Sequence, residues 1–441
     1  MVGRTERKCG SAPAVSPHVS RPHISRLHIS AFPLSPESSV LSTSFHAILL
    51  LATIIILNPA ISRAADLRII KTAHYRIHTD LDDNLADDLS RRLDAMYDEY
   101  SRRLAEFAPA GDSTPLEAYV VQSKEKYLHI VGLQMAGTGG AFSAQRHLLA
   151  AFLDGQGRDA LRRTLQHEAF HQFVFKAIGP NVPVWLNEGL AQVFEEAVWT
   201  GNSFELGQVP PRRLRHLKKE IQASSIIDFR SFLKMTPMQW AVGWSDPVEA
   251  GRQYNQAWAM AHFLVYATDD QGRFKYRARL LQMLQFLHDG YDGEAAFEDA
   301  FSSNIEGFQR RFMEYAAGLT PTPLAALIEN QGVLADMEIQ MRKSGHTFDT
   351  LTDLRSSCEG LGLHILYKQG NLQWESAADP AVYFRSPSGE AFGSDDLHFE
   401  ISGDHVLPDL VCHSDGLSLR TRFDETSEGA IEHETIIESQ R

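Results

Sequence analysis

Residues 164–175 read TLQHEAFHQFVF and place two histidines four positions apart, with a glutamate directly after the first. On an α-helix this spacing turns the second side chain by only about 40° from the first, so both imidazoles can reach one ion. A glutamate beside the first histidine can act on water near the ion instead of binding the ion. These residue types therefore predict a metal-assisted hydrolysis site on His167, Glu168 and His171.

The apolar neighbours of this motif favour a metal site over a chance pattern. A chain of this composition is expected to contain about 0.05 H-E-x-x-H matches by chance. The pattern is therefore suggestive, and the residues around it must distinguish a metal site from a chance match. Leu165, Phe170 and Phe173 indicate a helix inside the fold, where three polar groups without partners would be costly and one cation would satisfy all of them. The alternative is a pair of core histidines hydrogen-bonded to their neighbours.

A second segment, VPVWLNEGLAQVFEE at 182–196, offers a third ligand. Pro183 favours the start of a helix, and Glu188 follows one turn later. The intervening turn GPNVP is tight, so the two helices can pack side by side with Glu188 facing the histidine pair. Two histidines, one glutamate and an open fourth position form the arrangement of catalytic zinc. The alternative for Glu188 is a capping or surface carboxylate near a helix N-terminus.

Together, the two segments resemble the gluzincin metallopeptidases. The block WLNEGLA is similar to the one that supplies the third ligand in the zinc-aminopeptidase and leukotriene-hydrolase family. The layout also resembles secreted bacterial gluzincin-like domains of unknown function. The close match covers residues 164–197 and a looser one covers residues 74–320. The resemblance implies one Zn²⁺ ion on His167, His171 and Glu188, with Glu168 as general base.

Hydrolysis of an amide also needs a donor to the oxyanion, and the segment QYNQAWAMAHFLVY at 253–266 offers two. Tyr254 and His262 lie two turns apart on one predicted helical stripe. In the aminopeptidase family the oxyanion-binding tyrosine follows the glutamate ligand at a similar distance, which favours Tyr254. The alternative for either side chain is ordinary core packing.

Two further residues of the second segment can support the ligands. Gln192 lies four positions after Glu188, where some gluzincins carry an acidic residue that orients a histidine ligand. A glutamine can accept that N–H bond, although without charge, so the basicity of the ligand differs. Asn187 can brace the zinc site or cap the helix locally.

The segment before the first motif is placed to bind an extended substrate. Gly140, Ala141 and Phe142 belong to GGAFSAQRHLLAAF, which reads as a strand that a peptide can extend by backbone hydrogen bonds. In the zinc-aminopeptidases a glutamate in the corresponding glycine-rich motif binds the free amine of the substrate. This chain has no glutamate there, which favours an endopeptidase or another hydrolase. The alternative is an ordinary edge strand.

The elements that must position these residues predict an α+β fold. Strands are expected at 74–80 and 116–123 and within 137–153, and an amphipathic helix at 85–107. A helix from a cap at Asp159 to Ile178 carries the histidines, and further helices follow to about residue 320. The prediction is a gluzincin-type domain over residues 66–320, with a small mixed sheet, an edge strand and a mostly helical subdomain.

The N-terminus is expected to be removed. Residues 1–45 are rich in Ser, Pro and His, which cannot build a packed core, and they form a disordered or mis-annotated extension. Residues 46–65 read as a signal peptide, because the apolar run 47–57 is too short to span a bilayer comfortably. The prediction is export to the periplasm or the extracellular space, without a stable membrane span, and an uncleaved anchor is the alternative.

The C-terminal third is expected to differ in character. After a hinge at 318–324, short strands predict a small β-rich region over 321–423, and the acidic residues 424–441 read as a disordered tail. Cys358 and Cys412 fall in this region. In an exported protein they can form a disulfide, and two separate buried thiols are the alternative.

Composition narrows the partners. The formal charge of −14 argues against a nucleic-acid surface. The favoured hypothesis is a secreted zinc metallopeptidase that acts on a peptide or protein, with its oligomeric state open. The alternative is a catalytically silent binding or structural protein on the same fold. Retention of Glu168 speaks against that alternative, since a purely structural metal site needs no base.

Overall fold

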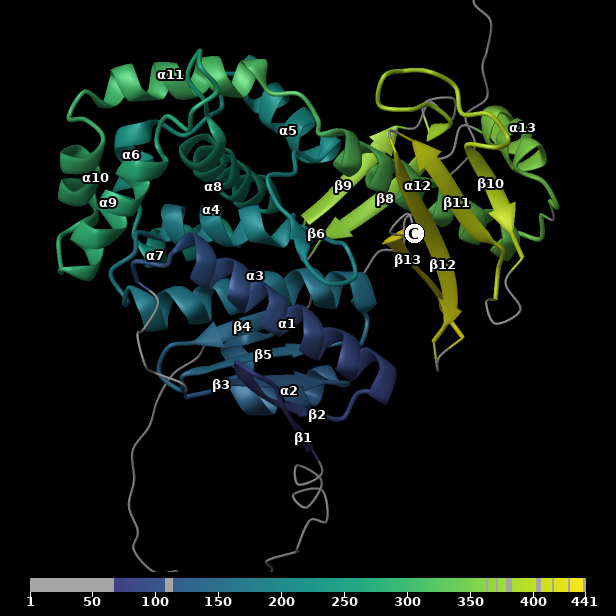
Figure 1. Ribbon diagram of the computed structural model, residues 1–441, viewed down its shortest axis with the longest axis horizontal. Helices are drawn as coiled ribbons and strands as arrows, with labels where there is room; N and C mark the ends of the chain where they lie inside the picture. Colours follow the sequence, from purple (N-terminus) through teal and green to yellow (C-terminus); the bar gives the residue numbers. More distant parts are fainter. Residues whose placement is uncertain are drawn as a thin grey trace, which may run out of the picture. The chain divides into compact units, whose positions relative to one another are not determined.

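The computed structural model describes the chain from residue 67 onwards, with short gaps (Figure 1). The predicted extension and signal peptide lie outside the described residues. Every described residue belongs to one compact unit, residues 59–441. The described ranges are 67–107, 114–346, 348–361, 364–369, 372–377, 383–401, 406–414, 416–426 and 429–438.

A five-stranded sheet begins the described chain, in the order β1-β2-β3-β5-β4. The strands β2, β3 and β5 are parallel, while β1 and β4 pair antiparallel at the two edges. The predicted third strand is therefore a hairpin, β4–β5, and β1 was not predicted. The bounds are β1 Arg68–Lys71, β2 Tyr75–Thr79, β3 Leu116–Val121, β4 Gly140–Ser143 and β5 Leu148–Phe152.

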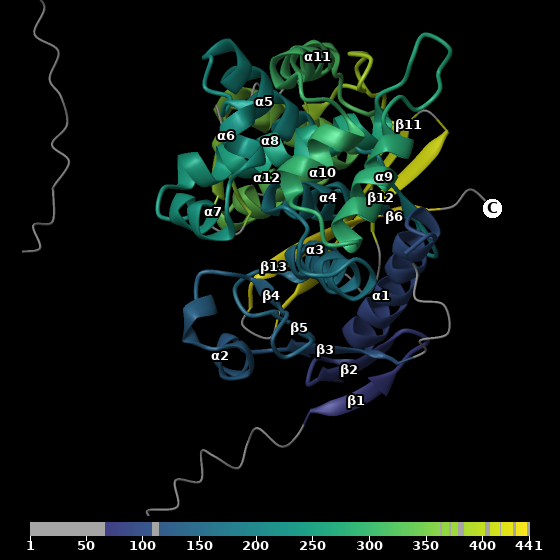
Figure 2. The ribbon, with the colours of Figure 1, turned by 90° about the vertical axis from the view of Figure 1, so that its left-hand side faces the viewer.

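Helices cover both faces of this sheet, because successive side chains along each strand point to opposite faces and both sets are apolar. Ala118 and Leu149 belong to the large core with α1 (Asp83–Arg103) and α3 (Arg158–Ala177). Ala150, on the opposite face, packs in a smaller core with α2 (Lys124–Val131). Figure 2 shows α1 and α3 on the same side of the sheet. Parallel strands that are buried on both faces require helices on each side of the sheet.

The histidine helix α3 has nearly the predicted bounds but a different start. Its N-cap is Gly157, which makes no side-chain capping bond, so the predicted cap at Asp159 is wrong. Asp159 lies within the first turn, where its carboxylate accepts a hydrogen bond from Arg163 Nε at 3.2 Å. The helix ends before Gly179, whose positive φ of 114° stops it as expected.

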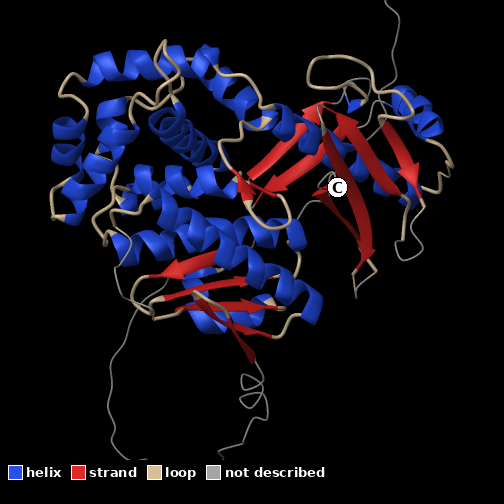
Figure 3. Ribbon diagram, viewed as in Figure 1, coloured by secondary structure: helices blue, strands red, loops and turns tan. Residues whose placement is uncertain are grey.

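A mostly helical part follows and extends to Gly318, as predicted (Figure 3). A two-stranded hairpin, β6 Val198–Trp199 and β7 Phe204–Glu205, interrupts it. A capping box of Thr236 and Gln239, with Pro237 at the first position, fixes the start of α7. The helices are α4 Val184–Glu195, α5 Pro211–Gln222, α6 Phe229–Leu233, α7 Pro237–Gly243, α8 Pro247–Tyr266, α9 Arg277–His288, α10 Gly293–Ala300 and α11 Ile305–Gly318.

The C-terminal region contains a β-sheet, as predicted, but it begins with helices. α12 (Pro323–Lys343) begins within the expected hinge at 318–324, and α13 (Leu351–Leu361) comes next. Residues 381–386, AVYFRS, belong to the region expected to form short strands, but their described part, 383–386, contains no regular strand. Arg385 forms only an isolated bridge. The strands are β8 His364–Gln369, β9 Leu372–Ala377, β10 Leu397–Glu400, β11 Asp409–Ser414, β12 Leu417–Glu425 and β13 Ile431–Glu438.

The predicted disordered tail is wrong for residues 431–438. These residues form β13, which pairs with β12 at the end of the sheet β10-β11-β12-β13. Its acidic residues have partners: Glu434 Oε1 lies 3.1 Å from Arg92 Nη2 and 2.6 Å from Arg162 Nη1. The composition of the segment shows its negative charges, but the positive charges that pair with them come from distant parts of the folded chain.

The two cysteines of the C-terminal region are buried thiols and not a disulfide. The sulfur of Cys358, on α13, lies 3.8 Å from Met341 Sδ on α12. Cys412 lies on β11, where burial raises the pKa of its thiol to about 12. Of the two alternatives left open by the sequence, the structure therefore has the separate thiols. Among the described residues, no helix combines the length and the apolar character needed to cross a bilayer.

The helices α4 and α8 approach each other with almost no space at one point. A Cβ added to Gly189 on α4 would lie 2.3 Å from the carbonyl oxygen of Ala257 and 3.0 Å from the Cβ of Ala261, both on α8. Real Cβ atoms do not approach a backbone oxygen so closely, so only glycine allows this contact. The glycine of the motif NEG is thus explained by helix packing.

We predict that Gly189→Ala destabilises the fold by about 1–3 kcal/mol, because α4 and α8 must move apart. Thermal unfolding should show a melting temperature several degrees lower than that of the native chain. Gly318→Ala is the matched control, since no heavy atom lies within 4 Å of its added Cβ. An unchanged melting temperature for Gly189→Ala would contradict the close contact.

Candidate metal centre

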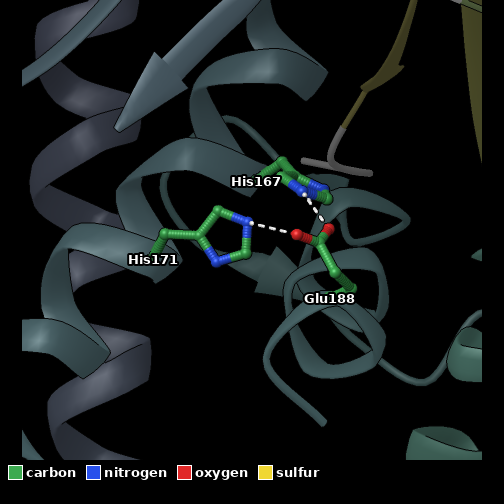
Figure 4. A group of neighbouring side chains, drawn as sticks. All are labelled: His167, His171 and Glu188. Carbon is green, nitrogen blue, oxygen red and sulfur yellow. Dashed lines mark hydrogen bonds and ion pairs between the residues drawn. The ribbon is translucent and has the colours of Figure 1, made fainter. Parts of the chain in front are cut away.

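Two neighbouring helices bring together three side chains of types that can bind a metal ion. His167 and His171 project from α3, and Glu188 projects from α4 between them (Figure 4). His167 Nε2 lies 3.2 Å from Glu188 Oε2, and His171 Nε2 lies 3.6 Å from Glu188 Oε1. One ligand atom from each residue lies within 4.8 Å of the other two. The structure therefore brings together the three residues that were predicted as ligands, as a cluster that could hold a metal ion.

The spacing of these atoms fits one small divalent ion. Zinc binds nitrogen and oxygen at about 2.0–2.1 Å, and ligands at that distance on a tetrahedron lie about 3.3 Å apart. The two nitrogen–oxygen separations, each to a different oxygen of Glu188, are close to this value. The imidazole rings meet edge to face, with centroids 4.7 Å apart and an interplanar angle of 82°. The side chains keep 11–15% of their exposure, so solvent can approach the cluster.

The electrostatics of the cluster also favour a cation. Burial lowers the pKa of the His167 imidazole, but hydrogen bonds to Glu188 and Glu195 outweigh it and the net pKa is well above the usual value. Burial raises the pKa of Glu188, and the nearby imidazoles outweigh this effect, so its net pKa is lowered. The carboxylate thus attracts positive charge between the rings, and a metal ion would replace the protons.

Glu195 supports the first histidine, a role that the sequence analysis missed. Its Oε2 lies 3.0 Å from His167 Nδ1, the ring nitrogen that does not face Glu188. A carboxylate on that nitrogen fixes the ring orientation and raises the basicity of the ligand. Glu195 follows Glu188 by seven residues, which is nearly two full turns, so both lie on one face of α4. That spacing is a signal the sequence carries.

Gln192, which the sequence analysis placed in this role, contacts other groups. Its Nε2 donates to the backbone oxygen of Glu188 at 3.3 Å, and its Oε1 accepts from Arg213. It therefore links the backbone of α4 to Arg213 and does not orient a histidine ring. Asn187 is half-buried, and its Oδ1 has no hydrogen-bond partner in the structure, so neither role predicted for it is evident.

Arg213, on α5, neutralises the carboxylates behind the cluster. Its guanidinium forms an ion pair with Glu196 and lies 3.7 Å from Glu195 Oε1. It is 7% exposed and lies over the ring of Trp258 at 5.7 Å. Glu196 Oε2 also lies 2.9 Å from Arg163 Nη1. Buried carboxylates need such partners to remain charged, and α5 therefore contributes to the electrostatics of the site.

Glu168 lies against the edge strand of the sheet. Its Oε2 accepts a hydrogen bond of 2.7 Å from the backbone N–H of Phe142 on β4. Gly140 and Ala141 precede Phe142 on this strand, so the three predicted substrate-binding residues adjoin the predicted base. A Cβ on Gly140 would lie 2.5 Å from Thr164 Cγ2, so this glycine allows β4 to approach α3.

The charge of Glu168 also affects Tyr127, a residue that was not predicted to belong to the site. Tyr127, on α2, is fully buried, and its oxygen lies 2.6 Å from Thr138 Oγ1. Its pKa is raised to about 12, chiefly by burial, with the hydrogen bond to Thr138 opposing the rise and the charge of Glu168 adding to it.

The structure separates the two candidate oxyanion donors. Tyr254 lies one turn before Ala257, the residue that contacts Gly189. Burial raises the pKa of its hydroxyl, and the charges of Glu188 and Glu168 raise it further. His262 instead shares a hydrogen bond of 2.7 Å with the Tyr315 hydroxyl, and burial lowers its pKa to about 4. Only Tyr254 thus lies in the field of the cluster.

A model of one protein family matches this part of the chain. The family is described as "Protein of unknown function (DUF1570)", and the match covers residues 162–279, 118 of the 441 residues. It spans most of α3, all of α4 and α8, and the start of α9, so it includes the three clustered ligands, Glu168 and Tyr254. No curated protein matches the chain.

We predict that Glu195→Gln weakens zinc binding by about 10- to 100-fold, because His167 loses its anionic partner. Competition with a chromophoric chelator would measure the affinity, and circular dichroism would confirm folding. Glu196→Gln is the matched control. It also removes a buried carboxylate beside Arg213, but the hydrogen bond from Glu195 to His167 remains. Equal zinc affinities of the two variants would contradict the role of Glu195.

Proposed function

We propose that this chain is a zinc-dependent metallopeptidase of the gluzincin type. The observation that carries the proposal is the convergence of His167, His171 and Glu188, with Glu168 beside them on the sheet side. Ligands, candidate base and candidate oxyanion donor come from α3, α4 and α8, and α4 packs against both of the other helices. A purely structural ion would need neither of the last two groups.

Zinc in such a site lowers the pKa of a bound water towards about 7 and polarises a carbonyl group. Glu168 is assigned the proton transfers. Its Oε2 is engaged by the N–H of Phe142, which orients the carboxylate and leaves Oε1 to accept the proton of the attacking water. The same atom can then deliver the proton to the leaving nitrogen of the peptide.

Tyr254 is assigned the stabilisation of the oxyanion. Burial and the nearby carboxylates raise the pKa of its hydroxyl, so the group stays protonated and can donate a hydrogen bond at neutral pH. A donor held in a partly dehydrated site acts mainly on the charge that develops during the reaction. His262, the rival donor, is engaged by Tyr315 and is assigned to the core.

The edge strand β4 is assigned the substrate backbone. It pairs only with β5 in the five-stranded sheet, so its other edge can accept an extended peptide. Its sequence Gly140–Ser143 has no carboxylate for a free amine, which favours an endopeptidase over an aminopeptidase. Export to the periplasm or the extracellular space remains a part of the proposal that rests on residues 46–65.

Replacement of Glu168 tests the proposal most directly. We predict that Glu168→Gln keeps one zinc ion per chain but lowers the hydrolysis of an unstructured protein such as casein by at least about 100-fold, since the proton carrier is lost. Metal analysis and a fluorescent casein assay measure the two properties. Glu205→Gln, an exposed change on β7, is the control. Bound zinc without hydrolysis in the native chain would support the alternative, a catalytically silent binding or structural protein.

Tyr254→Phe tests the assigned donor. Loss of the hydroxyl should lower kcat about 100-fold with little change in KM, because the interaction forms mainly in the transition state. Tyr276→Phe is the matched control, since that buried hydroxyl has no hydrogen-bond partner in the structure. If His262→Gln lowered kcat while Tyr254→Phe did not, the assignment of the two residues would be reversed.

A further inference from the structure

Three aromatic rings lie together where the edge strand β4 meets the histidine helix α3. The ring centroid of Phe175 on α3 lies 5.5 Å from that of Phe142 on β4 and 5.5 Å from that of His147, which precedes β5. Phe142 and Phe175 are half-buried, and His147 is exposed. We call these three residues the β4–α3 aromatic group. Both phenylalanines lie outside the three apolar cores formed by the described residues, so the packing of those cores does not account for them.

The β4–α3 aromatic group adjoins the candidate metal centre on both of its elements, which pack directly on each other (Figure 2). On β4, the backbone N–H of Phe142 donates to Glu168 Oε2 at 2.7 Å. On α3, Phe175 follows His171 by one turn and Glu168 by nearly two turns, so the three side chains leave the same side of the helix. Phe175 therefore lies about 10 Å from the candidate base along the helix axis.

The pleat of β4 determines which substrate side chains meet this group. Ala141 packs in the core with α2, so Phe142, the next residue, points to the opposite face and reaches α3. A peptide that extends β4 points alternate side chains to the same two faces. The peptide residue opposite Phe142 would have its Cβ about 4.5–5.5 Å from that of Phe142. Since about 10 Å corresponds to three residues of an extended chain, the group contacts side chains within about three residues of the bond beside Glu168.

His147 contributes its ring from a strained backbone conformation. It lies in the turn between β4 and β5 with a φ of 52°, a left-handed conformation that favours glycine. Glycine would relieve the strain but would place no ring on Phe175. Such strain is found where the surrounding structure holds a residue for a function. The rings of His147 and Phe142 are inclined to that of Phe175 by 61° and 57°, a tilted arrangement that aromatic pairs prefer.

We propose that the β4–α3 aromatic group binds an aromatic side chain of the polypeptide substrate within about three residues of the cleaved bond. The inference rests on the proposed function, because it assigns the substrate class of the same site. The edge of β4 accepts any extended backbone, whereas the rings distinguish between side chains. Burial of a phenylalanine ring against Phe142 and Phe175 strengthens binding about tenfold relative to serine. Leucine forms no ring–ring contact and is expected to bind about threefold more weakly than phenylalanine.

A binding experiment tests the inference without turnover. The chain carrying Glu168→Gln is titrated with dye-labelled peptides of about twelve residues, built from Gly, Ser and Asn, with Phe, Leu or Ser at one central position. Fluorescence anisotropy gives each affinity. The phenylalanine peptide is expected to bind about tenfold more tightly than the serine peptide and about threefold more tightly than the leucine peptide. The ratios should be the same with and without zinc, because the aromatic group includes none of the candidate ligands.

Two changes in the same background remove rings from the group. Phe175→Ala should abolish the preference for the phenylalanine peptide. His147→Asn should reduce the preference about two- to threefold, and it keeps the turn because asparagine tolerates a positive φ. Tyr291→Ala is the matched control and should keep the preference, since this 45% exposed residue stacks on Phe286 with ring centroids 5.1 Å apart. Circular dichroism and zinc affinity should be unchanged in all three variants.

Equal affinities for the phenylalanine and serine peptides, or a preference that survives Phe175→Ala in a folded chain, would overturn the inference. Equal affinities for the phenylalanine and leucine peptides would overturn its aromatic selectivity. Failure of the proposed function looks different: the native chain loaded with zinc would bind the phenylalanine peptide preferentially but would not cleave it. If the native chain does cleave it, mass spectrometry of the products should place the cut within about three residues of the phenylalanine.

Discussion

The arrangement on which the site depends is one carboxylate held between two imidazoles. Glu188, His167 and His171 turn lone pairs towards one another in a largely buried space. Such an arrangement is costly unless a cation or shared protons lie between the groups. The chain therefore has to prevent α3 and α4 from separating. α8 lies on the other side of α4. The tight contact of Gly189 with Ala257 of α8 leaves α4 no room to move away from α3.

Much of the candidate metal site was predictable, because the sequence features that define it are local. The spacing of His167 and His171 is fixed by one helix, and the short turn after α3 constrains where Glu188 can point. The role of Glu195 could also have been predicted, since it lies nearly two turns after Glu188 on the same face of α4. Arg213 was not, because nothing local relates a residue of α5 to a carboxylate eighteen positions earlier. Its role exists only in the packed structure.

The errors in the fold have similar causes. The helix α12 is buried on several faces, with Leu327, Val333 and Met337 all in the core, so it shows no amphipathic stripe. The strand β13 is rich in charge and was interpreted as a tail, yet Glu434 pairs with Arg92 and Arg162 from far along the chain. Periodicity and composition report local environment, and both fail where distant elements supply the partner.

Tyr254 connects the candidate metal cluster with α7. Its hydroxyl lies in the field of Glu188 and Glu168, while its ring packs on Trp240 of α7. A shift of α7 would therefore move the ring that positions the hydroxyl.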